Sequence, residues 1–127
     1  MIKVIQIGTD NVVGVNLHTK ESGIGEYLNN AVGGWFDCVH NSDLEIVGYV
    51  HDEGLLLGLD INPIATALFG QVLVGTCVIV GALDANGVYD GDSHSVPEKA
   101  LERIAGLYPP FKMWLDHKHD LVTTEAE

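Results

Sequence analysis

The sequence predicts a single α+β domain, in which helices pack on one face of a mostly antiparallel sheet of about five to seven strands. Short apolar or alternating runs of strand length recur along the chain, and turn residues separate them. Helical patterns occur between some of these runs, without the regular strand–helix alternation of a parallel sheet. The 127 residues suit one hydrophobic core.

The chain begins with a predicted hairpin and a helix. Residues 2–7 read as a buried strand and residues 13–17 alternate between apolar and other residues, so the turn residues 8–11 are expected to join two antiparallel strands. Apolar residues at helical spacing predict a helix over 24–32. A glycine pair at 33–34 ends it, because glycine adopts the left-handed conformation that is common at helix ends.

A second strand pair follows the glycine pair. Residues 35–40 and 44–50 read as strands, and the turn residues 41–43 join them. Along 44–50 the apolar residues favour one face, which predicts a sheet with one side covered.

The stretch 48–75 is predicted to form the centre of the fold. Residues 51–54 turn the chain, and residues 55–59 read as a short apolar strand. Asn62 is expected to cap a short helix by accepting a backbone hydrogen bond, with Pro63 at the first helical position, where a missing N–H costs nothing. Gly70 ends this helix.

The remaining elements complete the predicted sheet and add C-terminal helices. Residues 72–83, rich in valine, are the best candidate for a central strand, and a turn at 84–87 returns the chain. Residues 90–94 read as a polar loop. Ser95 and Glu98 fit a capping box before the next helix, which the proline pair 109–110 stops.

The charge distribution disfavours two classes of partner. All six lysines and arginines lie outside residues 21–98, so this middle part carries the whole net charge of −12. Such a surface repels phosphate backbones and anionic lipid, which disfavours direct binding to nucleic acid or membranes. The acids either form a binding surface or only aid solubility. The chain has no apolar run of membrane-spanning length and no secretion signal at its start, so a cytoplasmic protein is expected.

The cysteines and tryptophans are assigned to the core. Cys38 and Cys77 each lie in an apolar strand-like run without a nearby second cysteine, which favours buried free thiols over a disulfide or a metal site. Trp35 and Trp114 are better explained by core packing than as interface anchors.

The functional suggestions are confined to two polar groups. His51, Asp52 and Glu53 are consecutive turn residues that point in different directions, so they lack the geometry of a metal site or an acid–base pair. Asp60 and Asn62 lie at the start of the short helix, where free backbone amides could hold an anionic ligand. The sequence therefore predicts no catalytic residue, no metal and no cofactor, and these five residues form the candidate interaction surface.

A series of short motifs runs through the first part of the chain. They are Val32-Gly33-Gly34-Trp35-Phe36, His51-Asp52-Glu53-Gly54, Gly58-Leu59, Asn62-Pro63-Ile64-Ala65, Val74-Gly75-Thr76 and Val80-Gly81. In this order they resemble an uncharacterised domain family common in bacteriophages and mobile elements. The resemblance covers about residues 1–90 of a domain expected at 1–118, with 95–118 as a helical addition and 119–127 as a flexible tail. It implies a phage or prophage origin.

Three functions remain open from the sequence. The first is a non-enzymatic phage accessory protein that binds and modulates a host protein through its acidic middle. The second is a small-molecule binder that sequesters a nucleotide or signal. The third and weakest is a small hydrolase, which needs histidine and carboxylate groups from distant segments to converge. Free strand edges also make a homodimer plausible.

Overall fold

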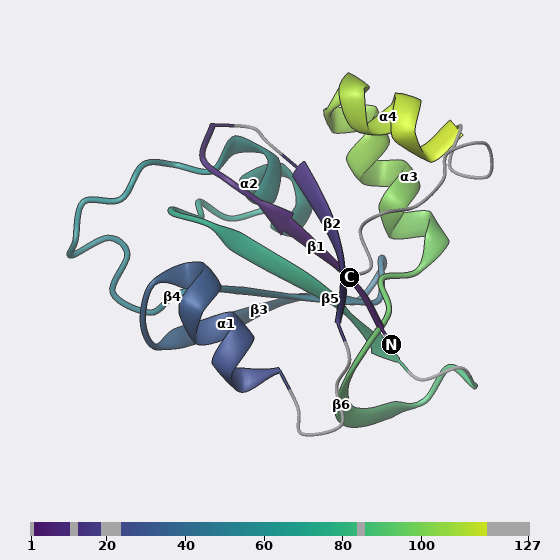
Figure 1. Ribbon diagram of the computed structural model, residues 1–127, viewed down its shortest axis with the longest axis horizontal. Helices are drawn as coiled ribbons and strands as arrows, with labels where there is room; N and C mark the ends of the chain where they lie inside the picture. Colours follow the sequence, from purple (N-terminus) through teal and green to yellow (C-terminus); the bar gives the residue numbers. More distant parts are fainter. Residues whose placement is uncertain (1, 11–12, 19–23, 84–85, 117–127) are drawn as a thin grey trace.

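A computed structural model describes residues 2–10, 13–18, 24–83 and 86–116 of the 127-residue chain (Figure 1). The elements are β1 (Ile2–Ile7), β2 (Val13–His18), α1 (Gly25–Val32), β3 (Phe36–Asn41), β4 (Ile46–His51), α2 (Pro63–Phe69), β5 (Cys77–Leu83), β6 (Tyr89–His94), α3 (Glu98–Leu107) and α4 (Pro109–Asp116). The expected tail at 119–127 lies outside the described residues. None of the helices in the described ranges is long and apolar enough to span a bilayer.

The six strands form one antiparallel sheet, which confirms the predicted α+β class. The strand order is β2-β1-β5-β4-β3, and β6 also pairs with β5. Both predicted hairpins form, β1 with β2 and β3 with β4. β5 is central, as its valine-rich sequence predicts, because β4 pairs along one edge and β1 and β6 share the other. The strand begins at Cys77, however, and residues 72–76 precede it as irregular chain.

The helices lie on both faces of the sheet, not on one as expected. α1 packs over one face, where Leu28 and Val32 join Val47 and Val78 in a buried cluster. A larger cluster on the other face joins β1, β4 and β5 to α2, α3 and α4. Figure 1 shows α1 on one side of the sheet and the other three helices across from it.

Coverage of both faces is visible along β4. Ile46 belongs to the larger cluster and Val47 to the cluster under α1, and both are buried. Tyr49 packs against the cluster under α1, while Val50 faces the other. The prediction of one covered side is therefore wrong, because small apolar residues on the second face bury against a helix rather than facing water.

The segment 90–94 was expected as a polar loop, but it forms most of β6. β6 pairs with β5 through Gly81↔His94 and Leu83↔Tyr89, with a register shift between these pairs. Antiparallel pairing of its backbone with β5 makes this segment a strand, although its side chains are mostly polar. Gly81 of β5 lies very close to the backbone at the end of β6, since a Cβ at residue 81 would clash with the Ser95 carbonyl oxygen.

The predicted capping box at Ser95 does not form. Pro97 occupies the N-cap of α3 and makes no side-chain cap hydrogen bond. The Ser95 hydroxyl instead accepts the Lys3 backbone N–H at 2.8 Å, and Val96 N–H donates to the Lys3 carbonyl at 3.0 Å. Residues 95–96 thus attach the start of α3 to β1.

Candidate functional site

Asn62 is part of the interior and is fully buried. As predicted, its Oδ1 accepts the Ala65 N–H, at 3.1 Å, and caps α2. Its Nδ2 also donates to the carbonyl oxygens of Ile7 and Gly75, each at 2.9 Å. The side chain therefore joins β1, α2 and the segment before β5. It has no surface to offer to a partner.

Asp60 lies two residues earlier and is exposed. Its carbonyl oxygen accepts the Gly75 N–H at 2.8 Å, and the neighbouring Ile61 forms an isolated bridge with Val74. The backbone here is thus fixed while the carboxylate faces solvent. The structure separates the two residues that the sequence places at one site, with Asp60 outside and Asn62 inside.

His51 is held by its own turn. Its Nδ1 accepts the Glu53 N–H at 3.0 Å, so the same nitrogen carries no proton for the Asp52 carboxylate 3.6 Å away. The other ring nitrogen lies against Gly34, where a Cβ would come within 2.7 Å of Nε2. This contact explains why glycine follows the helix end at Gly33. His51 is therefore structural, and Asp52 and Glu53 present the exposed carboxylates of the turn.

Residues 54–59, here called the leucine loop, fold as successive turns and not as the expected strand. Leu57 N–H donates to the Glu53 carbonyl at 3.0 Å, and Leu59 N–H donates to the Gly54 carbonyl at 3.0 Å. The N–H groups of Gly54, Leu57, Gly58 and Leu59 thus donate to carbonyl oxygens within residues 51–55, so local bonds shape this apolar run without a partner strand. Gly58 takes a positive φ of 70°, which suits the tight course of the chain.

The leucine loop exposes three consecutive leucines. Leu55, Leu56 and Leu57 are 78%, 85% and 57% exposed. Val72 is also exposed and, with Leu55 and Leu56, lines a cleft of about 500 Å³, here called the leucine cleft. Its floor comes from β3, β4 and the chain after α2. Its lining includes Val39, Val50, Leu73 and Val74.

Carboxylates surround this apolar cleft. Asp37, Asp52 and Glu53 line it and are exposed. Lysine and arginine are absent from residues 21–98, which contain every residue of its lining. The arrangement combines apolar side chains exposed to water with an uncompensated negative rim, and exposed apolar groups with a polar rim are typical of interaction sites.

Trp35 is 77% exposed, which contradicts its assignment to the core. Its carbonyl oxygen accepts the Asp52 N–H at 3.1 Å, so its backbone lies beside the acidic turn. The side chain of Trp114 lies outside the described residues.

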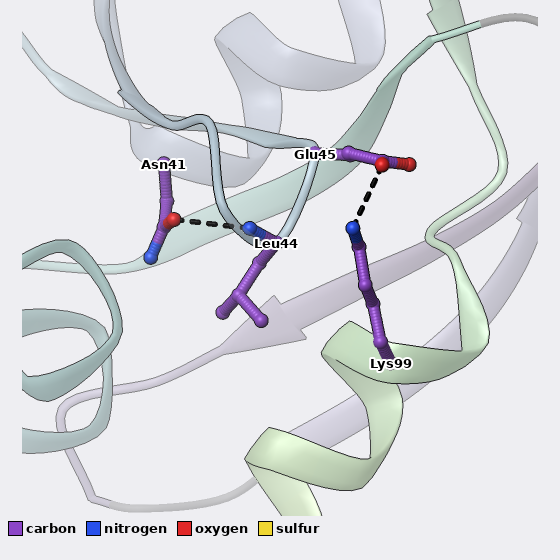
Figure 2. Close-up of polar contacts among 4 residues, drawn as sticks. All are labelled: Asn41, Leu44, Glu45 and Lys99. Atoms are coloured by element: carbon purple, nitrogen blue, oxygen red, sulfur yellow. Dashed lines mark hydrogen bonds and ion pairs between the residues drawn. The ribbon is translucent and has the colours of Figure 1, made fainter. Parts of the chain in front are cut away.

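A second cleft, of about 540 Å³, lies between the β3–β4 turn, the end of α2 and α3. Asn41 shapes it. Its Nδ2 donates to the Leu68 carbonyl at 2.7 Å. Its Oδ1 accepts the Leu44 N–H at 3.1 Å, as Figure 2 shows. Glu45 ends the turn with a positive φ of 59° and pairs with Lys99 at 2.7 Å. Arg103 lines the same cleft.

The two cysteines differ, although both were expected to be buried thiols. Cys77 is buried, and burial raises its pKa from 9.0 to about 12. Cys38 is exposed on β3, with its Sγ 3.8 Å from His40 Nε2. Burial, with the charge of Cys38 adding to it, also raises the pKa of Tyr49. The described residues contain no cluster of three or more side chains suited to hold a metal ion.

Sequence reasoning identified Asp52 and Glu53 of this surface but missed Asp37 and the leucines. The signal that could have found the leucines is the pair of glycines at 54 and 58, which leaves only three leucines between two residues typical of turns, the lower limit of strand length. Apolar side chains in such a run were assigned to the core because burial is their usual state.

Comparison with known proteins adds a family. No curated protein and no solved structure matches the chain. A family model described as a domain of unknown function, DUF3846, matches residues 2–108. The match extends beyond residue 90 and includes β6 and α3. The chain therefore belongs to the DUF3846 family.

Proposed function

We propose that this protein is a non-enzymatic accessory protein of a bacteriophage or mobile element, which binds and modulates a host protein in the bacterial cytoplasm. Binding takes place at the leucine loop and its acidic rim. The observation that carries the proposal is the exposure of Leu55, Leu56 and Leu57 on a hydrogen-bonded loop.

Exposed leucines on a folded loop are an unused source of binding energy. Burying one leucine side chain stabilises a complex by about 1.5–3 kcal/mol, before the costs of association. The local hydrogen bonds of the loop, from Leu57 to Glu53 and from Leu59 to Gly54, hold the leucines in place, so little ordering is needed on binding. These features favour a protein partner over a purely solubilising role for this surface.

The charge of the rim favours a basic partner. Asp37, Asp52 and Glu53 surround the leucine cleft without a lysine or arginine in its lining. A positively charged partner surface would gain in association rate and in specificity from these carboxylates. The acids lie next to the exposed apolar side chains. Burial of these apolar side chains would contribute affinity, and the carboxylates would raise the rate of association with a basic partner.

Affinity purification of the tagged protein from its bacterial host tests this proposal. We expect a host protein to copurify with the wild type and to be lost with the Leu55→Ser/Leu56→Ser double variant. Both leucines are exposed, so the variant should keep the wild-type fold and stability. The Asp52→Lys/Glu53→Lys variant should also lose the partner.

Two matched controls separate this surface from a general effect. Val88→Ser removes an exposed apolar side chain elsewhere, and Glu26→Lys/Glu102→Lys reverses two exposed charges on α1 and α3. Both variants should retain the partner. Retention of the same partner by a folded leucine variant would show that the proposed surface is wrong.

The second cleft favours one alternative, the binding of a small anionic molecule such as a nucleotide. Arg103 is the one arginine of the sequence and lines this 540 Å³ cleft, whose lining also includes His40, Ser42 and Asp43. A guanidinium suits a phosphate or carboxylate group. Mass spectrometry of gently purified protein would find a retained ligand, which Arg103→Ala should release. Absence of any ligand, together with no thermal shift from a nucleotide panel, would reject this alternative.

A further inference from the structure

The backbone of β3 has an outer edge that follows the leucine cleft. Among the described strands, β3 pairs with β4 alone. The Asp52 N–H donates to the Trp35 carbonyl, which places residue 35 and, by alternation, residues 37, 39 and 41 in hydrogen bonding with β4. The N–H and C=O groups of Phe36, Cys38 and His40 therefore point outward, where a further strand could pair with them.

Asp37 links this edge to the cleft. Its Oδ1 accepts the outward N–H of Cys38 at 2.9 Å, and the same residue lines the leucine cleft. The carboxylate thus occupies one of the donors that an added strand needs. This arrangement blocks unselective pairing, since natural sheets protect their edges with charged side chains. A partner that brings a positive charge to Asp37 would draw the carboxylate away from Cys38.

We propose, on the basis of the proposed function, that the partner contributes an extended basic segment that pairs antiparallel or parallel with β3. Every second side chain of this segment points to the face of the sheet that carries Val39 and the leucine cleft. Apolar side chains at these positions pack against Leu55 and Leu56. Lysine or arginine side chains at the rim meet Asp37, Asp52 and Glu53.

Charge complementarity selects this occupant over a second copy of the chain. A dimer formed by pairing β3 with β3 around a two-fold axis would bring the acidic rim of one protomer close to the same rim of its partner. Each copy carries a net charge of −12, all of it within residues 21–98. Like charges at such an interface oppose association, whereas a basic segment is attracted to the same edge.

A displayed library of random short peptides tests the proposal without knowledge of the natural partner. Peptides are selected on the wild-type protein and counter-selected on the Leu55→Ser/Leu56→Ser variant. We expect the selected sequences to alternate apolar residues with other residues and to contain lysine or arginine. Their affinity should fall as salt rises, and Asp52→Lys/Glu53→Lys should weaken it at least about tenfold.

Methylation of single backbone nitrogens in a selected peptide then tests strand pairing. N-methyl groups at alternate positions should each weaken binding about tenfold, because they remove the donors that face β3, and the positions between them should tolerate the change. This readout leaves the protein itself unaltered. A helical peptide would instead lose affinity at consecutive positions.

The outcomes separate the two proposals. In one outcome, the selected peptides need the leucines, but the effect of N-methylation shows no two-residue period. This result would overturn strand pairing and leave the proposed binding surface intact. A failure to select peptides that distinguish the wild type from the leucine variant, together with retention of the host partner by that variant, rejects both. Peptides with an acidic or uncharged consensus overturn the choice of a basic segment.

Discussion

Asn62 uses its side-chain amide at three places in the interior. The carbonyl oxygen caps α2, and the NH₂ group donates to Ile7 and Gly75. An amide suits this position because it supplies one acceptor and two donors on a single planar group. Serine and aspartate are equally good N-caps, but neither has two donors. The choice of asparagine therefore reflects the two carbonyl groups and not the helix alone.

The Asn62→Asp variant tests this explanation. The cap acceptor is kept, whereas the new carboxylate faces the Ile7 and Gly75 carbonyl oxygens inside the protein. We expect the free energy of unfolding in urea to fall by about 3 kcal/mol or more. Asn30→Asp, on the exposed side of α1, is the matched control and should change it by less than about 1 kcal/mol. Equal effects at the two sites would contradict the role assigned to Asn62.

Cys77 makes stability depend on alkaline pH. Burial raises the pKa of its thiol from 9.0 to about 12, so the folded state holds this proton more tightly than the unfolded state. The resulting stabilisation is complete below about pH 9 and is lost as pH rises from about 9 to 12. The raised pKa of Tyr49 acts in the same direction at higher pH.

Urea unfolding across this pH range measures the effect. The wild type should lose up to about 1.4 kcal/mol per pH unit from Cys77, and the Cys77→Ser variant should show a flatter profile even if it is less stable overall. The exposed Cys38 provides the control, because Cys38→Ser should keep the wild-type slope. A Cys77→Ser profile parallel to the wild type would show that this thiol does not cause the pH dependence.

Elements with strong local signals match the sequence predictions. Gly33 and Gly70 end α1 and α2 with positive φ, and Asn62 and Pro63 begin α2 as expected. Residues 55–59 and 90–94 do not match, because hydrophobicity predicts strand for the first and loop for the second. Backbone hydrogen bonding decides both cases: local bonds within residues 51–59 fold the first segment into turns, whereas β6 pairs with β5. Side-chain composition does not report such pairings.

The junction of β5, β6 and α3 depends on Gly81. A Cβ at this position would clash with the Ser95 carbonyl oxygen, which is backbone and cannot rotate away. We expect Gly81→Ala to lower the thermal midpoint and to cost about 1–3 kcal/mol of stability. The cost arises because residues 93–96 must shift, together with their hydrogen bonds to Lys3.

Gly106→Ala is the matched control. It lies in α3, and a Cβ there meets nothing within 4 Å. Alanine favours the helix by about 1 kcal/mol over glycine, so this variant should be as stable as the wild type or more stable. A Gly81→Ala protein with an unchanged midpoint would mean that the close approach to Ser95 is easily relieved.

At the scale of the whole molecule, charge opposes compactness. The middle of the chain has no positive side chain, and the ion pair from Lys99 to Glu45 brings a base from α3 to this part. Addition of salt should therefore raise the thermal midpoint, because it screens repulsion between exposed carboxylates over distances beyond about 3–10 Å. A scan from low to high NaCl measures this effect.

The charge variants supply the control for the salt scan. Glu26→Lys/Glu102→Lys lowers the net negative charge, so its midpoint should depend less on NaCl than that of the wild type. A midpoint that falls with salt would instead indicate that favourable ion pairs dominate the surface.

The candidate surface could be predicted only in part. Asp52, Glu53 and Asp60 are visible in the sequence as charged turn residues, and they are exposed. The leucine loop could not be found in the same way, since only the folded chain shows that its leucines are exposed and that two of them line a cleft with residues of β3, β4 and the chain after α2. The coverage of both faces of the sheet could not be predicted either, because the sequence around Val47 and Val78 does not indicate which helix covers them.

The position of β1 has a consequence for synthesis of the protein. β1 is made first, yet one of its two neighbouring strands, β5, begins at Cys77. Until residues 77–83 leave the ribosome, Ile5 and Ile7 can complete neither the sheet nor the core that joins them to Ile79. The nascent chain thus exposes these apolar side chains until β5 is synthesised, and exposed apolar segments of this kind are what chaperones bind. We expect a chain truncated before β5 to lack the core around Ile79 and to be degraded.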